Sequence, residues 1–377
     1  MGKSLSRFDF GSGILHGGSM PATKLPLLLG SEWQAVSPRP VGAKLLWQAG
    51  SRLLCSETDF AEPADLGEVG LVDCPVAVDP VRRMAYGYAS PQGRQQKDFS
   101  ELRAWHLEQG TGSRLFRLGL NQWTLWLLRY LPRHDALLGL VATDMPGEGV
   151  NIQHQLGIFD LGKMKTLLVS LPRDAFLPLD IHPTRKEVLF YGVEGYQVVE
   201  YSGKRLRKLA GSGLPEGRGG CYHPSGDKIL LGGSGIVLWD LAADRLVPLH
   251  PRGHHPLWDA SGEGFWFSES SGDLFHYSLA EGRAERVLAL AANAHPDIRY
   301  ARPPVATRDG RYLAVCLTRR VKRSAGSEPD APLYRHDHCL CVADTRKREV
   351  WQLPGPCRNA AWFEPADEPG KSRLQGR

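Results

Sequence analysis

Eight histidines and arginines stand at positions where a fold could collect them into one site. The residues are Arg218, His254, His255, His295, Arg299, His336, His338 and Arg358. The five histidines could offer neutral imidazole nitrogens to one divalent transition metal. With the arginines, they could instead bind a small acidic ligand or act on it as acid and base. Their spacing matches no fixed motif such as HExxH, so a metal site, a ligand site and a polar rim all stay open.

Other chemistry-bearing motifs are missing from the sequence. It contains neither a GxxxxGK[ST] phosphate-binding loop nor a GxSxG nucleophile elbow. Trp123 stands near a predicted loop, and an exposed tryptophan there would favour ligand or partner binding. The seven cysteines are scattered and include no CxxC pair, which indicates reduced structural thiols.

The elements that would position these residues come from a repeated two-part unit. The first part is a strand, a polar turn and a second strand, and it begins at Val76, Arg129, Leu179, Cys221, Leu257 and Pro304. The second part is an apolar strand, a turn and another short strand, and it begins at Leu102, Leu156, Tyr196, Ile236, Leu274 and Leu340. Each part predicts a β-hairpin, so the whole unit predicts a four-stranded antiparallel meander.

The period of the repeat predicts an all-β propeller. The unit recurs about every 40 residues where no insertion interrupts it, which is typical of propeller blades. Six units cover residues 70–355, and the chain then begins one more strand at Arg358. Segments at Ala43 and Arg52 could pair with that strand. We therefore expect seven blades, with the ring closed by N- and C-terminal segments. Six blades with a separate N-terminal decoration is the alternative.

The direction of the connections predicts one functional face. In a four-stranded meander, the middle turns and the links between blades open on one side, and the first and third turns open on the other. The insertions fall in three middle turns, at 90–100, 143–155 and 318–338. The site candidates lie in the links and at the ends of these insertions, so we expect them to converge on this side. By the same logic His182-Pro183 and His223-Pro224 lie on the opposite side, where they are structural turns.

One repeat identifies a family resemblance. The segment CYHPSGDKILLGGSGIVLWDLAADRLVPL contains the Trp239-Asp240 dipeptide and the turn His223-Pro224-Ser225-Gly226, and it resembles a WD40 repeat. The other units resemble the looser bacterial WD40-like and TolB-like propellers. The resemblance implies the fold, and it implies a protein-binding role without a cofactor. The segment from His295 also resembles oligouronide lyases, which are propellers with a histidine-held metal.

Composition sets further expectations. The net charge of +5 is modest, and the basic runs 204–208 and 319–323 alternate around an apolar residue, which argues for a solvated strand and against a nucleic-acid partner. The start of the chain lacks a signal-peptide core and no segment could span a membrane, so we expect a cytoplasmic protein. We expect a partly flexible extension at 1–40, a single propeller domain at 41–365, and a disordered tail at 366–377.

Two functions follow from these patterns. The first is a protein-binding scaffold that needs no cofactor. The second is a metal-dependent lyase or hydrolase that acts on a small acidic substrate through the histidines and arginines. The sequence favours the scaffold because it carries no catalytic signature, but it does not decide whether the chain is an enzyme.

Overall fold

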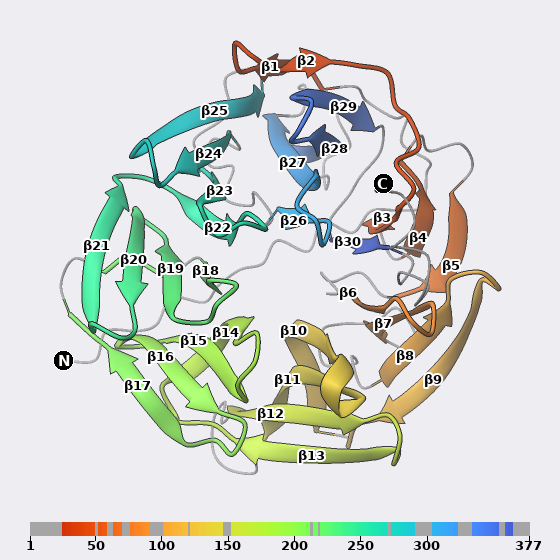
Figure 1. Ribbon diagram of the computed structural model, residues 1–377. Helices are drawn as coiled ribbons and strands as arrows, with labels where there is room; N and C mark the ends of the chain where they lie inside the picture. Colours follow the sequence, from red (N-terminus) through yellow and green to blue (C-terminus); the bar gives the residue numbers. More distant parts are fainter. Residues whose placement is uncertain are drawn as a thin grey trace, which may run out of the picture.

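The computed structural model describes most of the chain between residues 25 and 364. The described ranges are 25–49, 52–58, 63–69, 76–89, 101–119, 121–145, 152–211, 214–217, 219–269, 273–290, 304–322, 334–353 and 359–364. Seven sheets, each built on a four-stranded antiparallel meander, stand around a central axis (Figure 1). The predicted all-β propeller with seven blades is confirmed, and the six-bladed alternative is wrong. Residues 1–24 and the predicted tail 366–377 lie outside the described residues.

Blades 1 to 3 follow the chain in order, and each runs from its inner strand to its outer strand. Blade 1 contains β6 (Val76–Asp79), β7 (Met84–Ala89), β8 (Glu101–His106) and β9 (Thr111–Arg117). Blade 2 contains β10 (Gln122–Leu131), β11 (Ala136–Asp144), β12 (Ile152–Asp160) and β13 (Lys165–Ser170). Blade 3 contains β14 (Ala175–Ile181), β15 (Glu187–Gly192), β16 (Gly195–Glu200) and β17 (Arg205–Leu209). A short 3₁₀ turn, Pro132–His134, joins β10 to β11.

Blades 4 to 6 repeat the same meander. Blade 4 contains β18 (Gly220–Tyr222), β19 (Lys228–Gly232), β20 (Ile236–Asp240) and β21 (Arg245–His250). Blade 5 contains β22 (His254–Trp258), β23 (Gly264–Ser268), β24 (Leu274–Ser278) and β25 (Arg283–Leu290). Blade 6 contains β26 (Val305–Ala306), β27 (Tyr312–Lys322), β28 (Tyr334–Asp344) and β29 (Glu349–Leu353).

The seventh sheet, here named the closing blade, joins both ends of the chain as the sequence predicts. The C-terminal strand β30 (Ala360–Phe363) is its inner strand, and β3 (Lys44–Ala49), β4 (Arg52–Glu57) and β5 (Ala64–Glu68) complete it. Leu45 pairs with Trp362, and the Trp362 indole donates a hydrogen bond to the Val305 carbonyl of blade 6 at 3.0 Å. This mixed blade removes the sheet edges that an open ring would leave.

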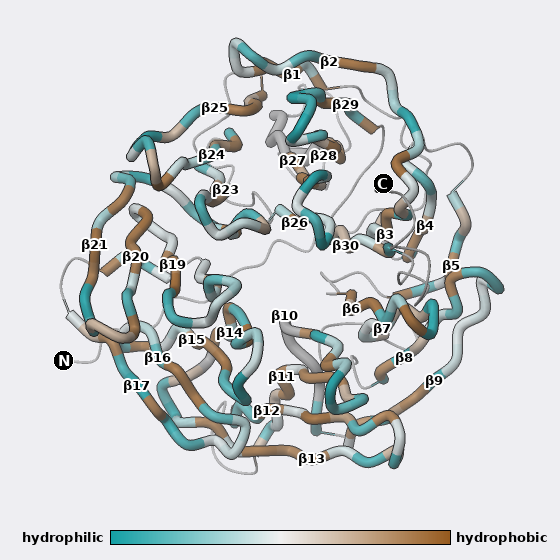
Figure 2. Tube along the Cα trace, in the orientation of Figure 1, coloured by the Kyte–Doolittle hydropathy of each residue, from teal (hydrophilic) through white to brown (hydrophobic). Residues whose placement is uncertain are grey.

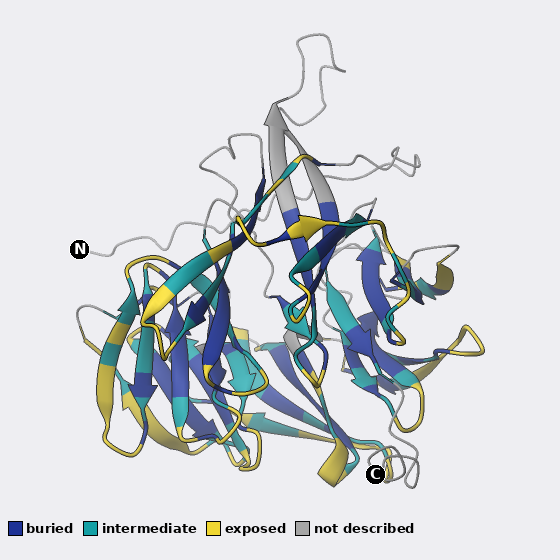
Figure 3. Ribbon diagram, turned by 45° about the horizontal axis from the view of Figure 1, so that its top comes forward, coloured by how far each residue is buried: buried dark blue, intermediate teal, exposed yellow. Residues whose placement is uncertain are grey.

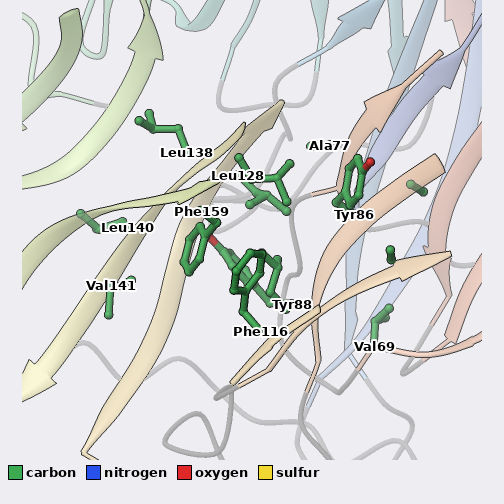
Figure 4. Close-up of a cluster of buried hydrophobic side chains, with 14 of the residues drawn as sticks. Val69, Ala77, Tyr86, Tyr88, Phe116, Leu128, Leu138, Leu140, Val141 and Phe159 are labelled. Atoms are coloured by element: carbon green, nitrogen blue, oxygen red, sulfur yellow. The ribbon is translucent and has the colours of Figure 1, made fainter. Parts of the chain in front are cut away.

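The blades pack on one another through apolar side chains on the faces of their strands. Between blades 1 and 2, Phe116 and Phe159 face each other with ring centroids 5.5 Å apart (Figure 4). Tyr86 and Tyr130 form a second contact across the same interface at 5.9 Å. Burial falls toward the outer strands, and the turns are hydrophilic (Figures 2 and 3). The sandwich of blades therefore explains why the middle strands read as continuous apolar runs.

The segment from Leu25 to Pro40, here named the strap, adds outer strands to two blades. Its strand β1 (Leu27–Leu29) pairs antiparallel with β25, and its strand β2 (Gln34–Ala35) pairs parallel with β29. Trp33 is buried, with its ring edge-on to Trp266 at 6.4 Å. The sequence did not reveal where this segment docks. The strap covers the outer edges of blades 5 and 6.

An ionic cluster fixes the end of the strap. Arg39 bonds to the carboxylate of Glu349 and lies 3.5 Å from the fully buried carboxylate of Asp344. Arg311 approaches the same Asp344 oxygen at 3.1 Å. The Arg39 guanidinium also lies over the Trp351 ring, 5.4 Å from its centroid, which is within cation–π range.

Candidate binding face

Two hairpins rise from the side of the ring that holds the middle turns and the links between blades, here named the loop face. In blade 6, β27 and β28 have eleven residues each, whereas β23 and β24 in blade 5 have five each. In blade 2, β11 and β12 have nine each. At about 3.3 Å per residue, the blade 6 strands are longer than those of blade 5 by roughly 20 Å. The insertions therefore lengthen strands as well as loops.

The structure corrects the predicted bounds of two insertions. The insertion predicted at 318–338 is a ladder at both ends, where Thr318 pairs with His338 and Arg320 pairs with His336. The insertion predicted at 143–155 likewise begins and ends in strands, and His154 pairs with Ala142. Paired backbone groups continue the sheet hydrogen bonds beyond the blade body, so these histidines are strand residues and not loop residues. The insertion predicted at 90–100 lies outside the described residues.

The adjacent histidines of blade 5 lie on its inner strand. His254 pairs with Ser268, and the register shifts between His254 and Leu257, which marks a β-bulge. His255 has a positive φ of 50° in this bulge. The two ring centroids are 6.4 Å apart, and both residues are half-buried. The pair therefore enters the blade at its inner edge, as the sequence predicts.

Two glycines of blade 4 allow β22, the strand that contains His255, to lie close to blade 4. A Cβ on Gly219 would lie 2.8 Å from the His255 backbone nitrogen, and Gly219 has a φ of +154°. A Cβ on Gly232 would lie 2.5 Å from Cδ of Pro256. No larger residue fits at either position without moving β22 away from blade 4.

The metal hypothesis stays a prediction. The described residues contain no group of three or more His, Cys, Asp or Glu that could hold a metal ion. Of the predicted ligands, His254 and His255 have described side chains, whereas only the backbones of His336 and His338 are described. Arg218, His295, Arg299 and Arg358 lie outside the described residues. Trp123 lies on β10 opposite Ala142, and only its backbone is described.

Asp180, a half-buried carboxylate on the inner strand of blade 3, is not among the residues that the sequence singles out. The Tyr222 backbone N–H of blade 4 donates to Oδ2 of Asp180 at 2.8 Å. Burial raises the pKa of Asp180, while Arg129 of blade 2 acts in the opposite direction. Asp180 therefore ties the inner strand of blade 3 to the inner strand of blade 4. The only sequence signal was an acidic residue within an otherwise apolar strand.

The side opposite the loop face is built from interlocking turns, and the structural role predicted for its two histidines is confirmed. Nε2 of His182 lies 3.1 Å from the Gly226 carbonyl of the next blade, and Nδ1 accepts the backbone N–H groups of Thr184 and Arg185. His223 repeats the arrangement, with Nε2 3.3 Å from the Gly262 carbonyl. Nε of Arg185 also lies 2.9 Å from Nε2 of His182, and Nη2 of Arg185 donates to the same Gly226 carbonyl at 3.3 Å.

The Trp-Asp dipeptide also has a structural role. Trp239 is 1% exposed, and its indole N–H donates to Oδ1 of Asp244 at 3.1 Å. Asp240 accepts the backbone N–H groups of Ala242 and Ala243, both at 3.0 Å, and so closes the turn after β20. Both residues of the dipeptide therefore stabilise blade 4 internally.

Comparison with known proteins supports the fold. No protein-family model matches the sequence, and no curated protein matches it. Among solved structures, the chain is similar to the dihydro-heme d1 dehydrogenase NirN in complex with DHE, with 13% identity and a TM-score of 0.56. That match covers 90% of this chain and 80% of the other. At such low identity it shows the fold alone.

Two further structures have lower TM-scores. TolB from Acinetobacter baumannii gives 13% identity and a TM-score of 0.46, covering 86% of this chain and 68% of TolB. A chain of the Mitotic Checkpoint Complex gives 9% identity and 0.49, covering 95% and 90%. The sheet topology itself makes the chain a seven-bladed β-propeller. The described part of the structure has no helix long and apolar enough to cross a membrane.

Proposed function

We propose that this propeller is a cytoplasmic protein-binding scaffold and that its partner docks on the loop face. The observation that carries the proposal is the pair of lengthened hairpins in blades 2 and 6. Blades 3, 4 and 5 separate them on one side of the ring, and blade 1 and the closing blade separate them on the other (Figure 1). The two hairpins therefore stand on nearly opposite sides of the central axis of the ring.

Rigidity favours these hairpins as a docking element. Strands that continue the hydrogen-bonded ladder lose little conformational entropy on binding, unlike a flexible loop of the same length. The ladder between β27 and β28 is unbroken from Tyr312–Asp344 to Lys322–Tyr334. A partner would thus meet a preformed wall that stands on a packed blade.

The sequence of the blade 6 hairpin indicates an acidic partner. Positions 318–322 and 334–338 contain four Lys or Arg residues, two His residues and one Asp residue. Of the opposed pairs, Arg319–Asp337 alone combines a cation with an anion. Such an excess of positive charge on one element favours a partner segment rich in Asp and Glu.

Two of the four cations in the other basic run, 204–208, pair with carboxylates of blade 3. Arg205 pairs with Asp174 at 2.5 Å, and Lys208 bonds to Glu194 and lies 3.6 Å from Asp174. Arg207 donates to the Leu241 carbonyl at 2.7 Å. The excess of cationic residues is confined by sequence to this one hairpin and forms no long basic stripe, which fits a short acidic protein segment better than a nucleic acid.

The cysteines support the proposed compartment. Cys55, Cys221, Cys316, Cys339 and Cys341 are buried free thiols. Cys339 and Cys341 lie 3.9 Å apart, sulfur to sulfur, and share a hydrogen bond instead of a disulfide. Burial raises the pKa of Cys55 to about 11, which keeps this thiol protonated and unreactive. Thiols of this kind suit a reducing cytoplasm.

The two basic runs provide a matched test. Affinity capture from cell extract with quantitative mass spectrometry would compare the wild type, an Arg319→Glu/Arg320→Glu variant and a Lys204→Glu/Arg205→Glu variant. We expect the wild type and the 204/205 variant to capture the same acidic proteins. The 319/320 variant should capture at least about 10-fold less of them, which corresponds to a loss of about 1.4 kcal/mol in binding free energy. Identical profiles for all three proteins would contradict it.

A further inference from the structure

The outer strands of the blades differ in how they are protected against pairing with another chain. The strap covers β25 and β29. Among the described outer strands left uncovered, β5, β9 and β17 carry two or three charged residues each, and β21 carries Arg245 and Pro248. Charges and proline on an edge strand are the usual devices that prevent edge-to-edge association.

The outer strand of blade 2 lacks these devices. β13 reads Lys-Thr-Leu-Leu-Val-Ser, so its single charge stands at the first residue, and it contains neither proline nor glycine. The side chain of Leu167 is 57% exposed, and Met164 in the preceding turn is 52% exposed. Leu168 and Val169 are half-buried. The strand thus presents a polar backbone edge with an exposed apolar side chain at its centre.

We propose that β13 is the docking site for a second copy of this chain, which pairs with it antiparallel about a two-fold axis. Two copies of blade 2 would then form one continuous sheet of eight strands across the dimer. The strap shows that this propeller already accepts fifth strands on its outer edges, as β1 does on β25. This inference is independent of the partner proposed for the loop face.

The sequence of β13 is self-complementary in this arrangement. A two-fold axis through an antiparallel pair must pass through a residue that opposes its own copy. With Leu167 at the axis, Leu167 meets Leu167, Thr166 meets Leu168, and Lys165 meets Val169. No like charges face each other, and two exposed leucines bury one another.

The same pairing fails on β17. With the axis at Leu206, Arg205 would oppose Arg207 twice, and with the axis at Arg207 or Lys208 a cation would oppose its own copy. Like charges directly opposite each other destabilise a strand pair. The sequence of β13 therefore suits a symmetric strand pair, whereas that of β17 does not.

Sedimentation velocity across a concentration series of the full-length protein tests the proposal. A strand pair of this size belongs to the small, weak interfaces, so we expect a dimer with a dissociation constant on the order of 10 µM. Leu167→Lys should weaken it at least about 10-fold, because two ammonium groups would meet at the axis. Leu206→Lys places the same change on β17 and should leave the dimer intact. A wild type that stays monomeric, or a Leu167→Lys variant that dimerises equally well, would overturn the inference.

A cysteine at the axis gives an independent positive signal. Opposed residues have Cβ atoms about 4.5–5.5 Å apart, which is near disulfide range. With oxidised glutathione, Leu167→Cys should give a disulfide-linked dimer on a non-reducing gel, and Leu206→Cys should stay monomeric. Equal cross-linking of the two variants, or of Leu206→Cys alone, would count against β13 as the interface.

Discussion

The contact between His182 and the next blade leads to a quantitative prediction about Gly226. This glycine has a φ of +81°, and a Cβ added to it would overlap Cε1 and Nε2 of the His182 ring. Its carbonyl accepts the hydrogen bond from that same ring. A Gly226→Ala substitution therefore strains the backbone and displaces the imidazole that joins blade 3 to blade 4.

The expected cost has two parts. The left-handed backbone costs an alanine about 1 kcal/mol. Displacement of the ring removes the hydrogen bond to the Gly226 carbonyl, worth about 1 kcal/mol. The backbone N–H groups of Thr184 and Arg185 then pair with water, because both residues are exposed. We expect Gly226→Ala to lower the free energy of unfolding by about 2 kcal/mol.

Gly282 provides the control, because it has a φ of +63° and nothing lies within 4 Å of its added Cβ. Gly282→Ala should cost about 1 kcal/mol, the backbone part alone. Urea unfolding followed by tryptophan fluorescence would measure both variants. If the two substitutions lower the free energy of unfolding equally within about 0.5 kcal/mol, the contact between His182 and Gly226 does not stabilise the ring of blades, which would refute the prediction.

Three further predictions concern the same framework. Burial lowers the pKa of His182, so the folded state favours the neutral imidazole. The stability that the neutral ring contributes is present at neutral pH and is lost as the pH falls below about 6.5. The urea unfolding midpoints at pH 7 and pH 5 should therefore differ less for His182→Asn than for the wild type. Asp344→Ala leaves Arg39 and Arg311 facing a buried site without its carboxylate and should cost about 3 kcal/mol in thermal unfolding, whereas an unchanged midpoint would contradict the ionic cluster. Trp33→Ala should release the strap, so hydrogen exchange of the β1 amides should be faster in the variant than in the wild type, while the β19 amides stay protected. Equal exchange rates of the β1 amides in the variant and the wild type would show that Trp33 does not anchor the strap.

The sequence predicts the repeated core of this fold well. Strand periodicity and turn chemistry repeat in every blade, so the six meanders and the extra strand after Arg358 are visible without coordinates. The closing blade follows from one physical rule, that a lone terminal strand needs partners, and the pairing of Leu45 with Trp362 confirms it. The two His-Pro turns are confirmed on the side opposite the loop face for the same reason, since alternation along a meander fixes them.

The features that depend on contacts distant in sequence could not be predicted. The three residues of β1 belong to a short apolar run from Leu25 to Leu29 that contains Pro26, and only pairing with the edge of β25 makes them a strand. The ladder through Arg319, Arg320 and Lys322 carries charges that read as loop, and pairing with the facing strand overrides that local signal. Arg39 and Asp344 likewise meet only because the strap crosses blade 6.

The candidate site is predicted only in part. The sequence places His254 and His255 in the link that enters blade 5, and the structure places them on β22, the inner strand of that blade. Their convergence with His295, His336 and His338 stays a prediction, because it depends on side chains outside the described set. Asp180 shows the limit of motif reasoning, since its interaction with the Tyr222 backbone depends on how two blades meet and on no local pattern.

Two exposed valines on opposite sides of the ring test the central claim most directly. Val193 is 77% exposed in the middle turn of blade 3 on the loop face, and Val81 is 76% exposed in the first turn of blade 1 on the other side. Each would be replaced by the photo-cross-linker p-benzoylphenylalanine, and cross-linked proteins would be identified by mass spectrometry after irradiation of living cells. The scaffold account predicts a specific adduct from position 193 and none from position 81. A specific adduct from position 81, with none from position 193, would contradict it.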